Sequence, residues 1–307
     1  RDFALWKPPK EGEAYWETEL GAGRPGWHIE CTVMSMKYLG ESFDLHLGGE
    51  DLVFPHHENE IAQAEALTHK TFSRHWMHVR FLLVEGEKMS KSLGNFYTVR
   101  DLLLKGHKPS AVRFLLSSVP YRKQLNFTFD GLKQAAQSVD RLRNLRSRLQ
   151  MEKFPEGEST AMQELARSTR ARMRAALEDD LNTAQALAAI FDLVREANTA
   201  ADNGELRRGD IPALLGALQQ FDEIFAVLDD DDQHKIMRVL EWAQAEGRQV
   251  EAEVSTISDA EVEALVAERN AAKKARDFTR SDAIRDQLSA QGIVLEDTKD
   301  GVRWKRK

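Results

Sequence analysis

The sequence predicts an α/β region at the N-terminus, a mainly helical region after it and a small α+β region at the end. Residues 1–97 combine strand-like runs, SFDLHL and HVRFLLVEG, with helical patterns that follow glycine-rich turns, and this alternation is typical of an α/β sheet. From about residue 98 onward the pattern is nearly all helical. The last residues, IVLEDTKDGVRW, predict a hairpin with its turn at Asp300-Gly301.

The helical region predicts a bundle. In GLKQAAQSVDRLRNLRSRL, hydrophobic residues recur at intervals of three and four, as one buried face of a helix requires. This stripe consists of Leu132, Ala135, Val139, Leu142, Leu145 and Leu149. Three more helical patterns follow, in ELARSTRARMRAALEDDL, NTAQALAAIFDLVREANTAADNG and IPALLGALQQFDEIFAVL.

The chain divides into five predicted segments. The acidic run at 229–233 and the polar stretch at 251–258 bracket a short helical piece and are typical of a linker. Two further helical patterns and the hairpin follow it. The segments are an α/β domain at 1–97, a connector at 98–130, the helical bundle at 131–228, the linker at 229–258 and a C-terminal domain at 259–307.

Composition narrows the class of protein. The chain has 307 residues, 42% of them hydrophobic, a net charge of −7 and a single cysteine. We expect no membrane partner, because its apolar runs are much shorter than the roughly 20 residues that cross a bilayer. One cysteine forms no internal disulfide, which fits the reducing cytoplasm. The acidic net charge leaves a nucleic-acid partner open, because such binding depends on local Lys and Arg density.

Three residues form a candidate metal site. Cys31 lies in a helical pattern that starts after the turn Gly23-Arg24-Pro25-Gly26 and ends at Gly40. A helix starting at Pro55 would place His56 and Glu60 on one face, four residues apart. A thiolate, an imidazole and a carboxylate are ligands of zinc, and three of them leave a position open. The alternatives are that Cys31 is a small buried hydrophobe and that the acidic first turn is merely solvated.

The segment LLVEGEKMSKSLGNFYTVRDLL gives the most specific indication of a binding site in the sequence. Its Lys88-Met89-Ser90-Lys91-Ser92 loop lies between a strand and a helix that begins with a Thr98 and Asp101 capping box. Two ammonium groups on a short loop suit a triphosphate, because they can follow the charge that builds on leaving pyrophosphate. The alternative is an exposed loop with two incidental lysines.

The run FDLHLGGEDL suggests a nucleotide contact. Gly48 and Gly49 would let the backbone approach a ligand closely, and Asp51 could accept a hydrogen bond from a ribose hydroxyl. The alternative is a turn that ends a strand. Four more aromatic side chains either line a pocket or fill a core: Trp27, His28, Trp76 and His78.

The strings GRPGWHIEC, FPHHENEIAQ, WMH and GEKMSKSLGN, in this order, resemble the cysteinyl type of class I aminoacyl-tRNA synthetase. The segments DDLNTAQALA and GIVLEDTKDGVRWKRK are similar to the helical and anticodon-binding parts of the same family. The resemblance implies part of a Rossmann-like catalytic domain, then a helical bundle and a small anticodon-binding domain. It also implies ATP-dependent activation of cysteine to cysteinyl-adenylate and transfer to tRNA(Cys).

The resemblance assigns roles to single residues. It makes Cys31, His56 and Glu60 the ligands of one Zn²⁺, which selects the substrate thiolate, and it places Trp27 at the cysteine pocket. Lys91, with Lys88 beside it, would bind ATP, whose phosphates carry Mg²⁺. The candidates near the anticodon, with ordinary surface positions as the alternative, are Lys273, Lys274, Asp282, Asp297, Arg303 and Trp304. We expect a monomer.

Two features of the family pattern do not occur in this sequence. A His-x-Gly-His signature and a further zinc cysteine precede these motifs in the family, so we expect a truncated chain with little activity alone. Two other readings compete. One is the related cysteine ligase of mycothiol synthesis, and the other is a non-catalytic tRNA-binding module derived from a synthetase.

Overall fold

The computed structural model describes residues 3–248, 259–291, 293–298 and 301–306, which form two compact units. Unit 1 comprises Arg1–Tyr97 and Lys108–Gln233, and unit 2 comprises Thr98–His107 and His234–Lys307. The chain therefore enters unit 2 twice. None of the helices in the described ranges has the length and apolarity needed to cross a bilayer.

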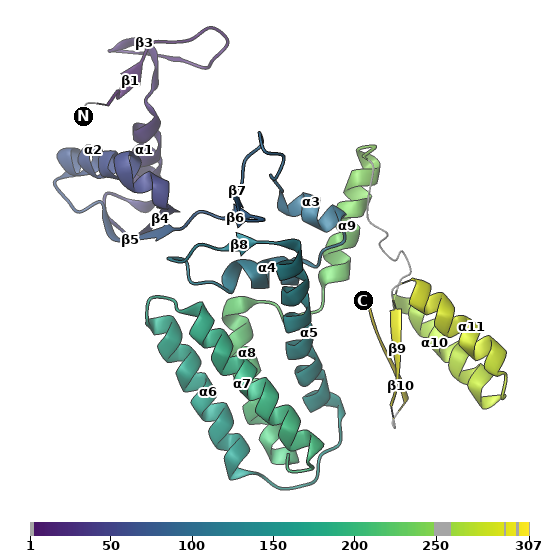
Figure 1. The fold of residues 1–307 in the computed structure, drawn as a ribbon. Coiled ribbons are helices and arrows are strands. Elements are labelled where there is room, and N and C mark those ends of the chain that lie inside the picture. The colour runs from purple at the N-terminus through teal and green to yellow at the C-terminus, as the bar shows by residue number, and fades with distance from the viewer. Residues whose placement is uncertain (1–2, 249–258, 292, 299–300, 307) are drawn as a thin grey trace. The chain divides into compact units, whose positions relative to one another are not determined.

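Unit 1 begins with a small antiparallel sheet that leads into a helix (Figure 1). Its strands are β1 (Trp6–Lys7), β2 (Trp16–Thr18) and β3 (Gly21–Pro25), and β3 pairs with both others. Gly26 follows, and any side chain there would collide with the backbone of Ala4. Helix α1 (Trp27–Leu39) begins directly after Gly26 and stops at Gly40, the predicted end, where φ is 91°.

Two parallel strands and two helices form the next part of unit 1. The strands β4 (Phe43–Gly49) and β5 (Ser73–Val79) pair in register from Phe43↔Ser73 to Gly49↔Val79. Between them come a 3₁₀ turn (Glu50–Leu52), a π-helical turn (Val53–His57) and α2 (Glu58–Thr68). The helix α2 packs on α1, and a small core forms from Phe43, Ala64 and Phe72.

Two local predictions in this region differ in detail from the structure. The predicted helix start at Pro55 falls in the π-helical turn, directly after Phe54, which is extended with φ −137° and ψ 131° as a residue before proline prefers, and the regular α-helix begins at Glu58. The run HVRFLLVEG is not one strand. It is split between β5 and β6 (Leu83–Val84), because backbone amides from Arg80 onward bond to residues 121–127.

A three-stranded mixed sheet pairs residues 83–88 with the end of the predicted connector. The strand β6 pairs antiparallel with β7 (Glu87–Lys88) and parallel with β8 (Asn126–Phe127). Helix α4 (Pro109–Ser117) lies between these strands in the chain and packs on α5. Lys88 is therefore the last residue of β7 and the first residue of the loop that follows.

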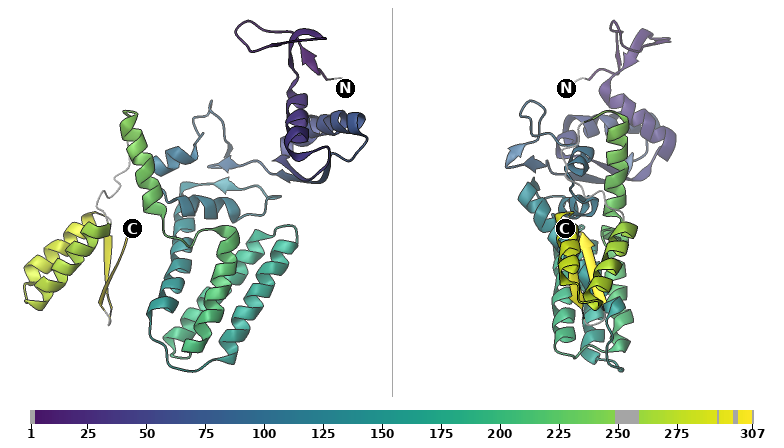
Figure 2. Two further views of the ribbon diagram at one scale, coloured as in Figure 1. Left: turned by 180° about the vertical axis from the view of Figure 1, so that it is seen from behind. Right: turned by 90° about the vertical axis from the view of Figure 1, so that its right-hand side faces the viewer.

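The helical bundle of unit 1 matches the predicted pattern (Figure 2). It consists of α5 (Phe129–Met151), α6 (Thr160–Glu178), α7 (Thr183–Asp202), a 3₁₀ turn (Arg208–Asp210) and α8 (Ile211–Phe225). All six residues of the predicted stripe on α5 are buried, with exposed fractions of 4% or less. The prediction of a bundle helix from this stripe is confirmed.

Unit 2 contains the C-terminal elements and one short helix from the middle of the chain. They are α3 (Val99–Leu104), most of α9 (Asp232–Ala245), α10 (Asp259–Lys274), α11 (Phe278–Ala290), β9 (Ile293–Thr298) and β10 (Gly301–Arg306). The two strands pair antiparallel, which confirms the predicted hairpin. Of its predicted turn, Asp300 lies outside the described residues and Gly301 is the first residue of β10. A core of Val262, Ile284, Leu288 and Ile293 joins the helices to the hairpin.

Candidate metal centre and nucleotide loop

The fold brings together the three predicted metal ligands, which lie far apart in the sequence. Cys31 comes from α1, His56 from the π-helical turn and Glu60 from the first turns of α2. One donor atom of each residue lies within 4.8 Å of the others. The packing of α1 on α2 produces this approach, so the proposed site depends on the tertiary fold of unit 1.

Glu60 occupies an unusual position for a carboxylate. Its side chain is 0% exposed, and neither oxygen has a hydrogen-bond partner. Oε1 lies 2.6 Å from His56 Nε2 and Oε2 lies 3.4 Å from His46 Nε2, but neither approach has the alignment of a hydrogen bond. Burial raises the pKa of Glu60 to about 7. Donor atoms that converge in this way without bonding one another fit a cation at the centre of the group.

Cys31 completes this donor set. It is a free cysteine of intermediate exposure. Burial, and then the nearby Glu60 and Glu30 carboxylates, raise the pKa of its thiol. The thiol therefore keeps its proton at neutral pH unless a metal replaces it.

An array of imidazoles surrounds the three residues. His28 Nδ1 lies 3.0 Å from His56 Nδ1, which leaves Nε2 of His56 directed toward Glu60. His57 Nδ1 lies 2.8 Å from His78 Nε2. We call the group of Cys31, Glu60 and the imidazoles of residues 28, 46, 56, 57 and 78 the histidine cluster.

Three imidazoles of the histidine cluster, those of His46, His56 and His57, favour the neutral form. Burial lowers the pKa of His46 and His56, and it lowers the pKa of His57 to about 4, with help from the neighbouring imidazoles. A neutral imidazole has a lone pair that can bind a metal. His46, His57 and Glu60 also bring donor atoms within 4.8 Å of one another, so Glu60 is shared by two candidate groups.

Sequence reasoning gave no role to His46 or His57. A signal for them existed in the pairing of β4 with β5, since His46 lies opposite Trp76 and Gly48 lies opposite His78. The rings of His46 and Trp76 stack, with centroids 4.5 Å apart. Local sequence patterns do not specify which residues of β4 and β5 lie opposite each other. The grouping of these histidines therefore could not be predicted from them.

Trp27 and the glycines of β4 lie at the histidine cluster. The Trp27 side chain is 57% exposed, and its ring centroid lies 4.8 Å from that of His56. At Gly48 a Cβ would collide with the His57 ring, and at Gly49 it would meet the Asp51 carboxylate. Close packing thus requires a glycine at position 48, and the assignment of Gly48, Gly49 and Asp51 to ATP stays a prediction.

The backbone of the KMSKS loop, residues 88–97, is stabilised by the side chain of Asn95, which was not among the predicted site residues. Asn95 Oδ1 accepts from the backbone amide of Ser90 at 2.8 Å, and its Nδ2 donates to the Lys88 carbonyl at 3.2 Å. The dipeptide Gly94-Asn95, a typical turn signal, marked this position in the sequence. Lys88 Nζ lies 5.0 Å from the centre of the Phe81 ring and Lys91 Nζ lies 5.6 Å from that of Phe96. Both lysines are exposed.

Three family models match the chain in order. The class I (C) tRNA synthetase catalytic domain matches residues 1–137, a DALR domain matches residues 172–229, and the cysteinyl-tRNA ligase anticodon-binding domain matches residues 258–304. Over the whole chain, the cysteine–tRNA ligases of Koribacter versatilis, Solibacter usitatus and Geobacter sulfurreducens are 67%, 56% and 46% identical. This chain belongs to the cysteinyl-tRNA synthetase family.

The family members are longer than this chain, which spans 64%, 62% and 63% of those three relatives. Among solved structures, the LeuRS of Agrobacterium radiobacter K84, in a ternary complex with tRNA and LeuAMS, aligns with a TM-score of 0.52 and 16% identity. That alignment covers 73% of this chain and 34% of the LeuRS chain. The predicted fold class, part of a class I catalytic domain followed by helical and anticodon-binding domains, is confirmed.

The predicted anticodon residues of this cysteinyl-tRNA synthetase family member lie in unit 2. Lys273 and Lys274 end α10, and Asp282 on α11 is exposed and forms an ion pair with Arg285 at 3.4 Å. Trp304 packs against the core beneath the hairpin. The side chains of Asp297 and Arg303 lie outside the described part of the structure. The anticodon role of all six residues stays a prediction.

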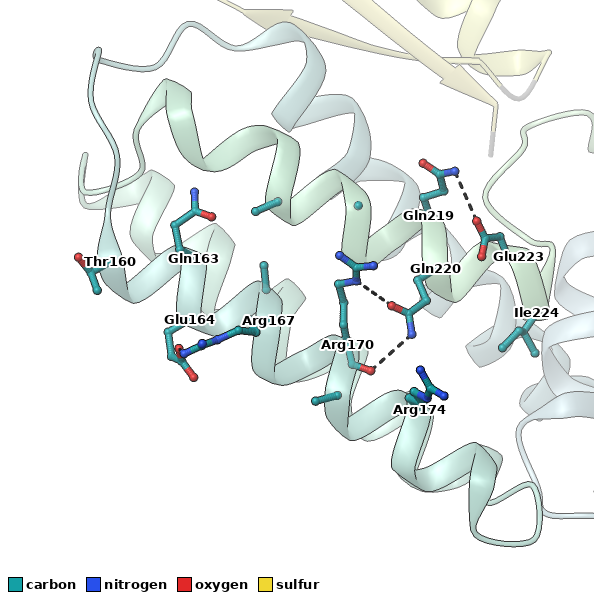
Figure 3. A pocket seen from close by; sticks show the side chains of 14 residues that line it. Thr160, Gln163, Glu164, Arg167, Arg170, Arg174, Gln219, Gln220, Glu223 and Ile224 are labelled. Atoms are coloured by element: carbon teal, nitrogen blue, oxygen red, sulfur yellow. Dashed lines mark hydrogen bonds and ion pairs between the residues drawn. The ribbon is translucent and has the colours of Figure 1, made fainter.

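A separate groove of about 1170 Å³ runs between α6 and α8 in the bundle (Figure 3). Three arginines line it. Arg170 Nε donates to Gln220 at 2.8 Å, while Arg167 and Arg174 form ion pairs with Glu164 and Glu178. Nearby carboxylates therefore offset much of the positive charge, and none of the predicted site residues is among the lining residues.

Proposed function

We propose that this chain carries part of the machinery of a cysteine–tRNA ligase, which activates cysteine with ATP and transfers it to tRNA(Cys). The observation that carries the proposal is 67% identity, along the entire chain, to a cysteine–tRNA ligase. The match of residues 258–304 to an anticodon-binding domain favours tRNA over the amino sugar of a mycothiol-type ligase. We place the reaction in the cytoplasm.

The histidine cluster supports a Zn²⁺ ion as the cofactor that selects cysteine. Cys31 Sγ, His56 Nε2 and a Glu60 oxygen would hold it, because these atoms already converge and neither carboxylate oxygen has a hydrogen-bond partner. When bound, zinc supplies an open coordination position that prefers a soft thiolate to a serine hydroxyl. His28 orients His56 through the Nδ1 contact, and Trp27 covers the cluster beside the proposed cysteine pocket.

The KMSKS loop supports ATP, with its Mg²⁺, as the second substrate. Lys88 and Lys91 carry exposed ammonium groups that lie near aromatic rings. Among the described residues neither lysine forms a salt bridge, so each can move to a phosphate without breaking one. In the proposed reaction the cysteine carboxylate attacks the α-phosphate and pyrophosphate leaves. The lysines would stabilise the charge that develops on pyrophosphate, and Asn95 would keep the loop backbone folded during this step.

The experiment that tests the proposal is cysteine-dependent exchange of labelled pyrophosphate into ATP, with serine in place of cysteine as the substrate control. In a ligase of the full length of its relatives, these residues should support exchange with cysteine and not with serine, while the 307 residues alone should show little exchange. In that full-length protein K91A should lower the rate roughly 100-fold, the size typical for removal of one charge-stabilising donor. K70A is the matched control, because Lys70 is an exposed lysine of unit 1 that pairs with Glu41. Binding of zinc and tRNA without any exchange would instead support a non-catalytic tRNA-binding module.

A further inference from the structure

The short helix α3, which follows the KMSKS loop in the chain, is held by a tryptophan of α9. The Arg100 guanidinium carbon lies 3.9 Å from the centre of the Trp242 ring, and that of Arg248 lies 5.0 Å from it. Guanidinium groups at these distances from an indole make cation–π contacts, which are strongest with tryptophan. Both helices belong to unit 2, and Figures 1 and 2 show α3 beside α9.

Helix α3 depends on such contacts, because it spans only Val99–Leu104. A single helix of this length is unstable in water. Its start is closed by a capping box, in which Asp101 Oδ2 accepts from the Thr98 amide at 2.8 Å and Thr98 Oγ1 accepts from the Asp101 amide at 3.1 Å. Arg100 lies between the two capping residues, so the contact with Trp242 and the capping box hold the same turn.

This turn lies directly after the KMSKS loop. The loop begins at Lys88, in the sheet of unit 1, and ends at Tyr97, whose ring lies 5.4 Å from that of Phe129. Thr98, the next residue, belongs to unit 2. The loop is therefore anchored in unit 1 through Lys88 and Tyr97 and continues by one peptide bond into the capped start of α3, so loss of α3 structure would free the last residues of the loop.

We propose that Trp242 is a positioning residue for the KMSKS loop, acting through Arg100 and α3. With the contact intact, α3 holds the end of the loop, and less ordering is needed when Lys88 and Lys91 meet a triphosphate. This inference rests on the proposed function, in which the loop binds ATP. Neither the zinc ligands nor the anticodon candidates take part in it.

The test is the rate of trypsin cleavage after Lys88 and Lys91 in the full chain, followed by mass spectrometry with and without MgATP. We expect W242A to raise the ATP-free cleavage rate about 5-fold, within the roughly 2- to 30-fold range that one cation–π contact corresponds to. The MgATP concentration that gives half protection should rise by a similar factor. R100A should behave like W242A, and W242F, which keeps an aromatic ring, should restore most of the wild-type behaviour.

The control is R141A, which removes a comparable cation–π contact in the bundle, where Arg141 lies 5.1 Å from the centre of the Phe191 ring. It should leave cleavage at both lysines unchanged, and zinc binding should be unchanged in every variant. Wild-type cleavage in a W242A protein with native circular dichroism would overturn the inference, as would failure of W242F to restore protection. If MgATP fails to protect the wild type, the proposed function is contradicted, and the ATP-free rates still decide the role of Trp242.

Discussion

In the bundle, the side chains buried along α5 are all hydrophobic and at most 4% exposed, whereas in the histidine cluster the most buried side chains are imidazoles and a carboxylate. Burial of hydrophobic side chains is favourable in itself. Burial of Glu60 without a hydrogen bond is unfavourable, and something must offset it. The comparison indicates that burial in the bundle serves stability, whereas burial in the histidine cluster serves binding. Substitutions in the two regions should therefore affect stability and zinc affinity differently.

The largest effect on stability is expected in the bundle. L142A removes a fully buried side chain from the α5 stripe and should lower the free energy of unfolding by about 3 kcal/mol, within the usual range for a core leucine. Urea unfolding measures this change. The exposed Q137A on the same helix should change it by less than about 0.5 kcal/mol. Zinc affinity should be unchanged in both, and a loss of zinc binding in L142A would contradict the separation of the two regions.

In the histidine cluster we expect effects of opposite sign on stability and on zinc affinity. E60Q removes the buried carboxylate and should stabilise the zinc-free protein by about 1–2 kcal/mol, because an amide can donate to an imidazole nitrogen. The same change should lower zinc affinity by at least the roughly 10- to 100-fold that loss of an outer partner of a ligand causes. Thermal melting with and without zinc, and competition with a chromogenic chelator, measure the two quantities.

The matched control for E60Q is E58Q, which changes an exposed carboxylate two residues earlier, at the start of α2. It should leave zinc affinity unchanged and alter stability by a few tenths of a kcal/mol, through the helix dipole alone. A zinc-free E60Q protein that melts below the wild type would show that Glu60 serves the fold and not a cation.

The two regions also differ in how far the sequence predicts them. The α5 stripe follows from a spacing of three and four residues, which is local information, and each of its members is buried. The approach of Cys31 to His56 and Glu60 follows from helix packing. In the sequence their residue types and the spacing of His56 and Glu60 suggested a metal site, and the family resemblance assigned all three as its ligands. The contact of His57 with His78 depends on the pairing of β4 with β5, which no local pattern specifies.

Where local signals compete, the sequence predicts the element but not its limits. After the extended Phe54, the predicted helix start at Pro55 falls in a π-helical turn, and the regular α-helix begins only at Glu58. In the KMSKS loop the lysines were predicted from charge, while Asn95, which holds the backbone of the loop, was found only from its hydrogen bonds. The capping box of Thr98 and Asp101 was predicted and is confirmed.

The smallest effect is expected at this capping box, which belongs to neither region. Hydrogen bonds from Thr98 lower the pKa of Asp101 below its ordinary value. A carboxylate with a lowered pKa stabilises the fold above its unfolded pKa of about 3.9, and this contribution is lost as the pH falls through the lower folded value. D101N should therefore cost about 1 kcal/mol at pH 7 and less at pH 3, below the unfolded pKa. Thermal melting at both pH values checks this.

The control for D101N is T98A, which breaks the same pair of interactions. The double variant should cost little more than either single change, because both act on one contact. A cost of D101N that is the same at pH 7 and pH 3 would rule out a charged cap.

The order of the chain through the two units has a consequence for synthesis on the ribosome. Arg100 is translated about 140 residues before Trp242, which at the usual 5–20 residues per second is a delay of about 7–30 seconds. During that time α3, too short to persist alone, has no tryptophan to dock on, while the α5 stripe can already pack against the helices translated after it. The support of the KMSKS loop is thus completed after the hydrophobic bundle, since Trp242 follows the end of α8 at Phe225 by about 1–3 seconds of translation.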